Sequence, residues 1–141
     1  AQYKETEQLD FLLTKDNHPN TKGAVDLGLT TTQGISRIVA DVNAGNVDLL
    51  FVIKENIPEG MDLSKVIVLD TNLTDAAKNA SLAIPIQIFA EMLGSFTNKN
   101  GLVQSFEQSM TAPKGLLSSA GVFGALLSKL SETREVAVGN R

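Results

Sequence analysis

The chain has 141 residues, of which 43% are hydrophobic, a size and composition typical of one domain with one sizeable core. Its formal net charge is -4, with 16 acidic and 12 basic residues, which argues against nucleic acid as a partner because phosphate binding requires clustered Lys and Arg. There is no cysteine and only one histidine, His18, which excludes disulfides, iron-sulfur ligation, thiolate zinc sites and multi-histidine metal sites within the chain.

Membrane insertion is also unexpected. No apolar run approaches the ~20 residues that span a bilayer, and the amino end, AQYKETEQLD, lacks the pattern of a signal peptide. We therefore expect one cytoplasmic domain covering residues 1–141.

The first half of the chain alternates apolar runs with turn-rich segments. Residues 9–14 (LDFLLT) fit a first strand, and residues 15–23 form a loop by composition. A helix is predicted over residues 33–44, with an N-cap from Thr30–Thr32 and a C-terminal glycine at Gly45. Its apolar residues recur at helical spacing, namely Ile35, Ile38, Val39 and Val42.

Two nearly continuous apolar runs follow, at residues 47–53 and 66–69. Such runs are typical of strands covered on both faces, as in a parallel sheet. The carboxyl ends of parallel strands face the ligand crevice, so the loops at 54–60 and 70–74 are expected on one rim.

The second half contains further helices and one more strand. Residues 74–80 predict a short helix capped by Thr74, and residues 82–84 a brief strand that Pro85 stops or places at an edge. An amphipathic helix is predicted over residues 116–130, followed by a polar end expected to fray. Together these elements predict a three-layer, Rossmann-like α/β domain with a mainly parallel sheet of about four strands, residues 47–53 being central.

One segment, residues 89–104 (FAEMLGSFTNKNGLVQ), is polar and glycine-punctuated, with isolated large apolar residues. It is expected to lie over a surface, with Phe96 and Val103 anchored in the core and with Thr97 and Asn98 holding its turn. This closing segment resembles the end of the third domain of the molybdopterin oxidoreductase family. The matching residues are Glu91, Gly94, Phe96, Thr97, Asn98, Gly101, Val103 and Gln104, whereas Ser95, Asn100 and Leu102 depart from the family pattern.

A second stretch, residues 20–28, also resembles that family through Asn20, Gly23, Ala24, Asp26 and Gly28. The resemblance implies that strand-end residues approach a pterin dinucleotide, and the corresponding positions here are Lys54, Glu55, Asn56, Asp70 and Thr71. In the family the connection after the first of these strands is longer and carries a helix, but residues 54–64 leave little room for one. We therefore expect no cofactor in this chain.

Other sites receive little support from the residues. His18 lies in a polar loop beside Pro19 and is expected to be solvated, so no catalytic residue is predicted. The sequence has no GxGxxG fingerprint, so a plain Rossmann site is not predicted. The spacing of its carboxylates matches no metal-binding pattern, so a metal site is not predicted either.

The resemblance leaves three functions open. The favoured one is a structural domain akin to that of the large peripheral-arm subunit of NADH-quinone oxidoreductase, the respiratory complex I, excised from a larger subunit. The expected partners are other domains of that subunit, which carry iron-sulfur clusters, and neighbouring subunits at the cytoplasmic face of the inner membrane. The alternatives are the cofactor-binding domain of a molybdenum-dependent formate dehydrogenase or related oxidoreductase, which would hold molybdopterin dinucleotide, and a stand-alone nucleotide-binding module.

Overall fold

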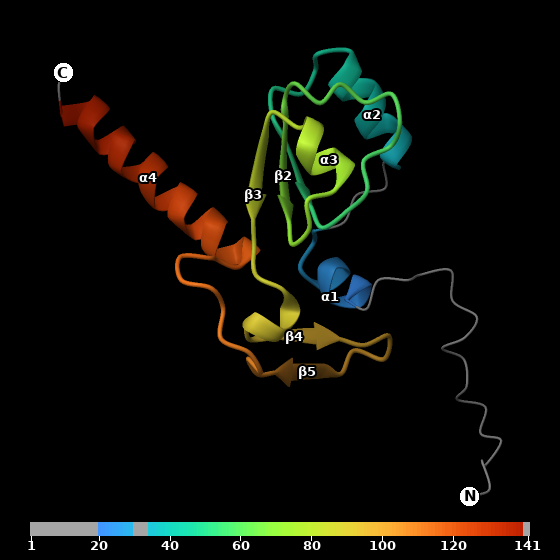
Figure 1. The fold of residues 1–141 in the computed structure, drawn as a ribbon, viewed down its shortest axis with the longest axis vertical. Coiled ribbons are helices and arrows are strands. Elements are labelled where there is room, and N and C mark those ends of the chain that lie inside the picture. The colour runs from blue at the N-terminus through green and yellow to red at the C-terminus, as the bar shows by residue number, and fades with distance from the viewer. Residues whose placement is uncertain (1–19, 30–33, 140–141) are drawn as a thin grey trace, which may run out of the picture. The chain divides into compact units, whose positions relative to one another are not determined.

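The computed structural model describes residues 20–29 and 34–139, with side chains through residue 133. These residues fall into two compact units, one containing residues 20–29 and 94–106 and the other residues 34–93 and 107–139 (Figure 1). The strand predicted over residues 9–14, the cap at Thr30–Thr32 and His18 all lie outside the described residues.

The larger unit is built on a three-stranded parallel sheet of β1 (Leu50–Ile53), β2 (Val66–Asp70) and β3 (Leu82–Pro85). The α/β class and the parallel sheet are thus confirmed. The central position was predicted wrongly: the described strand order is β1-β2-β3, so β2 lies in the middle and β1 pairs on one side only. Burial gives the reason, because Val66, Val68 and Leu69 of β2 are at most 1% exposed whereas Ile53 of β1 is 42% exposed.

Helix α2 (Ile35–Asn43) precedes β1 and ends as the sequence predicts. Gly45 has a φ of 77°, its N–H donates to the Val42 carbonyl, and the Asn46 N–H donates to the Asp41 carbonyl. This pair of bonds is the Schellman arrangement, which requires a left-handed residue and therefore favours glycine.

Helix α3 (Asp75–Asn79) connects β2 to β3 and begins at the predicted cap. The Thr74 hydroxyl oxygen accepts a hydrogen bond from the Ala77 N–H at 3.2 Å. Because the helix is only one to two turns long, its formation depends on this cap and on the burial of Ala77.

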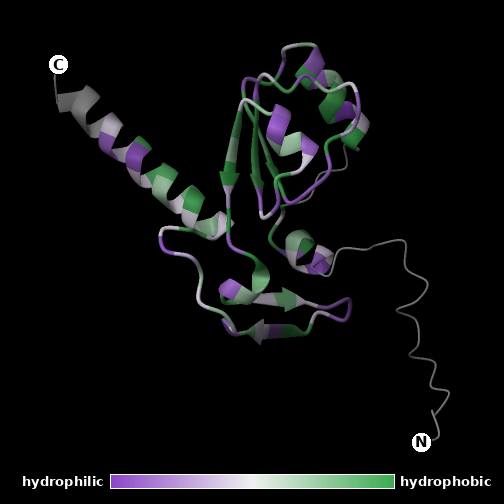
Figure 2. Cartoon of the chain, in the orientation of Figure 1, coloured by the Kyte–Doolittle hydropathy of each residue, from purple (hydrophilic) through white to green (hydrophobic). Residues whose placement is uncertain are grey.

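The core lies between one face of the sheet and helices α2 and α3. Its buried members are Val42, Met61, Val66, Val68 and Ala77. Side chains alternate along a strand, so Phe51 lies on the opposite face from Leu50 and Val52, which pack against this core. There its ring meets Phe123 of α4 (Ser119–Gly139) edge-on, with ring centroids 5.1 Å apart. Helices therefore contact both faces of the sheet, and the strands are hydrophobic along most of their length (Figure 2).

The connection from β1 to β2 contains no helix between residues 54 and 65. It is held instead by Asn43, whose side-chain amide donates to the Gly60 carbonyl and whose side-chain oxygen accepts from the Asp62 N–H, both at 2.8 Å. Met61 between them is buried, so the loop contributes to the core.

Helix α4 differs from its prediction at both ends. Leu116 and Leu117 are not helical: Leu117 forms a parallel bridge with Ile86, and the Ser118 hydroxyl oxygen accepts from the Gly121 N–H, which starts the helix. The end expected to fray is helical through Gly139. Lysine and glutamate are good helix formers, and the pair Lys129 and Glu132 is bonded at 2.8 Å.

The smaller unit contains α1 (Thr21–Asp26) and a two-stranded antiparallel hairpin of β4 (Gly94–Thr97) and β5 (Val103–Phe106). Residues 21–23 were predicted as loop but begin α1, which is closed by an ion pair between Lys22 and Asp26. The Asn20 side chain accepts a hydrogen bond from the Thr97 N–H at 2.8 Å and so joins α1 to β4.

The closing segment therefore forms a hairpin rather than an irregular cover. Its predicted turn is confirmed for Asn98, whose side-chain oxygen accepts from the N–H groups of Asn100 and Leu102, both at 3.0 Å. The predicted anchors are wrong: Val103 is 60% exposed, and Phe96 is 38% exposed and stacks on Phe106. The register of the hairpin gives the reason: Phe96 pairs with Gln104 and Val103 with Thr97, so Phe96 and Val103 lie on opposite faces and cannot both enter one core.

Candidate functional site

The strand-end residues of the sheet form a common rim in the larger unit. Ile53 pairs with Leu69 and Leu69 pairs with Ile84, so the chain leaves all three strands at the same edge. The Lys54 N–H donates to the Leu69 carbonyl at 2.9 Å and extends the ladder by one bond. Lys54 directly follows β1 and Asp70 is the last residue of β2, so both lie at the carboxyl ends of neighbouring strands, as the sequence predicts.

Lys54 is the only non-glycine residue with a positive φ, 51°, among the described residues. This left-handed conformation is costly for a residue with a Cβ. The side chain also forms a hydrogen bond within the protein, because its ammonium donates to the Gln87 carbonyl at 3.0 Å. The cation of this rim is therefore held by the protein's own backbone.

Asp70 and Thr71 form the next part of the rim. One carboxylate oxygen of Asp70 accepts from the Thr71 N–H at 2.6 Å and from the Asn72 N–H at 3.2 Å. The Asn72 side-chain amide donates to the Thr71 hydroxyl at 3.2 Å. This is an Asx turn, and it occupies backbone N–H groups that a ligand would otherwise use.

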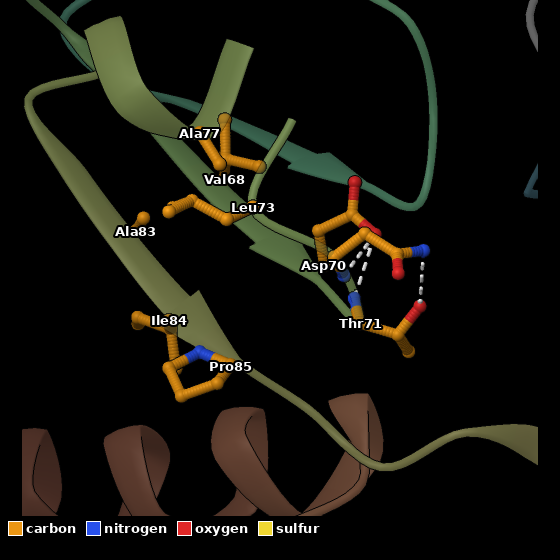
Figure 3. Close-up of a pocket in the computed structure, with 9 residues that line it drawn as sticks. Val68, Asp70, Thr71, Leu73, Ala77, Ala83, Ile84 and Pro85 are labelled. Carbon is orange, nitrogen blue, oxygen red and sulfur yellow. Dashed lines mark hydrogen bonds between the residues drawn. The ribbon is translucent and has the colours of Figure 1, made fainter. Parts of the chain in front are cut away.

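A hollow of about 250 Å³ lies beside this turn. Figure 3 shows Asp70 and Thr71 at one end and Ile84 and Pro85 at the other, with an apolar wall between them. That wall is formed by Val68, Leu73, Ala77 and Ala83.

Glu55 and Asn56 lie elsewhere. They border a separate hollow of about 190 Å³ with apolar residues of α2 and β1, including Ile35, Ile38 and Phe51. The Glu55 carboxylate accepts from the Asn56 N–H at 3.0 Å. Lys54 thus lies at the same sheet edge as Asp70 and Thr71, whereas Glu55 and Asn56 border a different hollow from Asp70 and Thr71.

Gln87 is the rim residue that the sequence prediction missed. It accepts from Lys54, its N–H donates to the Leu117 carbonyl at 2.9 Å, and its side-chain amide donates to the Leu116 carbonyl at 2.8 Å. It links the ends of β1 and β3 to the segment before α4. Its position just after β3 could have identified it, because residues at the carboxyl end of the third parallel strand face the same crevice.

The rim offers few groups for an anion. The amino end of α3 carries Asp75, whose pKa is lowered by the hydrogen bond and charge of Lys78. A carboxylate already occupies the positive end of that short helix. Across residues 20–29 and 34–139, no three His, Cys, Asp or Glu side chains converge as metal ligands. No helix in the same ranges is long and apolar enough to cross a membrane.

Comparison with known families identifies the family of the chain. A family model described as molybdopterin oxidoreductase matches residues 4–129. The chain belongs to the molybdopterin oxidoreductase family. Comparison with curated proteins and with solved structures gave no match.

The molybdopterin oxidoreductase family implies a pterin cofactor with a diphosphate. A diphosphate is held by free backbone N–H groups at a helix start and by cations. Here the β1–β2 connection has no helix, the Lys54 ammonium is bonded to Gln87, and the amides after β2 are bonded to Asp70. The residues present at this rim do not fit that group.

Proposed function

We propose that this molybdopterin oxidoreductase-family chain is a structural α/β domain of a larger oxidoreductase subunit, akin to the large peripheral-arm subunit of NADH-quinone oxidoreductase. In this role it binds no pterin dinucleotide and supports neighbouring domains that carry iron-sulfur clusters. It works at the cytoplasmic face of the membrane within a complex.

The observation that carries the proposal is the self-contained rim of the sheet. The Lys54 ammonium donates to the Gln87 carbonyl, the Asp70 carboxylate accepts from the Thr71 N–H, and the Gln87 side-chain amide donates to the Leu116 carbonyl. A ligand would have to break these bonds before forming its own, and each broken bond costs about 1 kcal/mol net. This arrangement favours a supporting role over a binding role.

The apolar surface of the larger unit supports the partner half of the proposal. Leu73, Phe89 and Leu93 are 71%, 69% and 75% exposed. We propose that neighbouring protein covers these three side chains in the assembly. The expected neighbours are other domains of the same subunit and adjacent subunits.

A calorimetric titration tests the cofactor half. The purified chain is titrated with a guanine dinucleotide and, separately, with inorganic pyrophosphate, and Lys54→Ala serves as the matched variant. We expect no saturable heat. Binding tighter than about 10 μM, equivalent to roughly -7 kcal/mol, that is weakened in Lys54→Ala would establish a rim site and favour the formate dehydrogenase alternative.

Isolation of the native assembly tests the complex half. A tagged copy of the full-length protein is expected to sediment with membranes and to be released by an alkaline wash. The isolated material should oxidise NADH and show iron-sulfur signals in electron paramagnetic resonance. Formate-dependent dye reduction by the same material would contradict the proposal, and isolation of the chain without other redox proteins would favour a stand-alone module.

A further inference from the structure

The turn of the β4–β5 hairpin contains two asparagines in different chemical situations. Asn98 is followed by Lys99, and its side-chain oxygen accepts two backbone N–H groups. Asn100 is followed by Gly101 and is exposed; among the described residues it contributes only its own backbone N–H to this network. Its side-chain amide is left to solvent.

We propose that Asn100 is a site of spontaneous deamidation and that Asn98 sets the rate. In this reaction the backbone nitrogen of Gly101 loses its proton and attacks the side-chain amide carbon of Asn100. A carbon–nitrogen bond forms, ammonia leaves, and a five-membered succinimide results. Water then opens the ring to give aspartate or, through the other carbonyl, isoaspartate.

Access to the attacking nitrogen is open at Gly101. Its φ is 84°, and a Cβ built at this position would meet no atom within 4 Å. Any other residue would place a side chain beside the nitrogen and slow the attack. Asn100-Gly101 is the only Asn-Gly pair in the sequence.

The folded turn restrains the same nitrogen. The Gly101 N–H donates to the Asn98 carbonyl at 2.9 Å, so the turn must open before the proton can leave. The two bonds to the Asn98 side-chain oxygen hold the turn closed. Deamidation in the native chain therefore follows the fraction of open turn, as hydrogen exchange does.

The product would alter the hairpin. Isoaspartate adds a carbon to the backbone between residues 100 and 101, and either product adds a negative charge. The bonds from Asn100, Gly101 and Leu102 to Asn98 then lose their register.

The experiment incubates the full chain at mildly alkaline pH in heavy-oxygen water and follows each asparagine by peptide mass spectrometry. Incorporated heavy oxygen separates conversion during the incubation from earlier damage. The unfolded chain in urea gives the unrestrained rate. Asn98→Ala removes the side-chain acceptor, Asn98→Asp retains an acceptor, and Asn100→Gln removes the five-membered ring.

We expect Asn100 to convert before any other asparagine in the native chain, more slowly than in urea. Loss of the two bonds in Asn98→Ala should raise the native rate by about thirtyfold, whereas Asn98→Asp should stay near the wild-type rate and Asn100→Gln should be inert. Conversion at another asparagine first, or none at Asn100 when the unfolded chain converts, overturns the site. Equal native rates in Asn98→Ala and wild type overturn the role of Asn98.

Discussion

At the residue scale, Asn43 stabilises the β1–β2 connection, which contains no helix. Its amide makes two hydrogen bonds of 2.8 Å, to Gly60 and Asp62. We expect Asn43→Ala to lower the free energy of unfolding by about 1–2 kcal/mol, since each bond contributes about 1 kcal/mol. Urea unfolding measures this. Asn79→Ala, which removes one exposed bond to the Asp75 carbonyl, is the control and should cost less; equal losses would argue against the role of Asn43.

Asp62 makes the same loop sensitive to acid. Hydrogen bonds from the Ser64 backbone and side chain lower its pKa, and the charge of Lys65 adds to the effect. A lowered pKa in the folded state stabilises the fold above the unfolded value, about 3.9, and this contribution is lost as pH falls through the folded pKa. Asp62→Asn keeps an oxygen acceptor but does not titrate.

Unfolding free energies of wild type and Asp62→Asn should therefore differ most near neutral pH and converge as the pH is lowered below the folded pKa. Titration of the Asp62 carboxyl by nuclear magnetic resonance gives that value directly. A difference that grows toward acid would contradict the assignment. The ion pairs Arg37–Asp41 and Asp75–Lys78 are common to both proteins and cancel in the comparison.

At the element scale, β2 carries the core. Leu69 is fully buried in β2, whereas Leu73, four residues later, is 71% exposed. Leu69→Ala should cost about 2–5 kcal/mol because it leaves a cavity, while Leu73→Ala should change stability by less than about 0.5 kcal/mol. Chemical denaturation of the two variants checks this contrast, and similar losses at both positions would mean that the core lies elsewhere.

Glycines in two elements should respond in opposite directions to alanine. At Gly94 in β4 a Cβ would lie 2.6 Å from the Phe106 ring, which must then leave its stack on Phe96. Gly124 in α4 faces open space. Gly94→Ala should destabilise the hairpin by about 1–3 kcal/mol. Hydrogen exchange of the β4–β5 amides should therefore accelerate in this variant. Gly124→Ala should stabilise α4 by about 0.5–1 kcal/mol; unchanged hairpin exchange in Gly94→Ala would refute the close contact.

Sequence patterns predicted those elements whose apolar spacing and capping residues indicate the same structure. Helix α2 with Gly45, α3 with Thr74, and the edge position of β3 follow from local rules. The order of strands and the start of α4 do not, because they depend on long-range pairing, such as the bridge between Ile86 and Leu117. The β4–β5 hairpin was missed because its apolar residues are too few to show alternation.

The candidate site was predictable in part for the same reason. The strand-end rule located Lys54, Asp70 and Thr71, which lie at the carboxyl ends of β1 and β2. It could not reveal that the Lys54 ammonium bonds the Gln87 carbonyl, because a side-chain to backbone bond between residues 33 positions apart leaves no local trace. Separation of Glu55 and Asn56 from the rim likewise depends on the path of a loop without secondary structure.

At the scale of the whole molecule, the core is small for the chain. Its buried hydrophobic residues in the described ranges are Val42, Met61, Val66, Val68, Leu69, Ala77 and Ile86. We expect an unfolding free energy at the low end of the usual range, about 5 kcal/mol, for the chain alone. Urea unfolding at several protein concentrations measures it. A value above about 10 kcal/mol without any concentration dependence would contradict the proposal that partner domains stabilise this chain.

Gln87 has a consequence for how this chain tolerates change in length. Its bonds to Leu116 and Leu117 hold the two ends of the segment 88–115 next to each other. This segment, here called the excursion, therefore forms a closed loop. A second tie, from Ser109 and Met110 to the Ala90 carbonyl, narrows the base of that excursion. Closing a loop whose ends are already adjacent depends only weakly on its length, about 0.6 kcal/mol for each doubling. We therefore expect the parallel sheet to tolerate changes in the length of residues 88–115 at a small cost in loop-closure free energy.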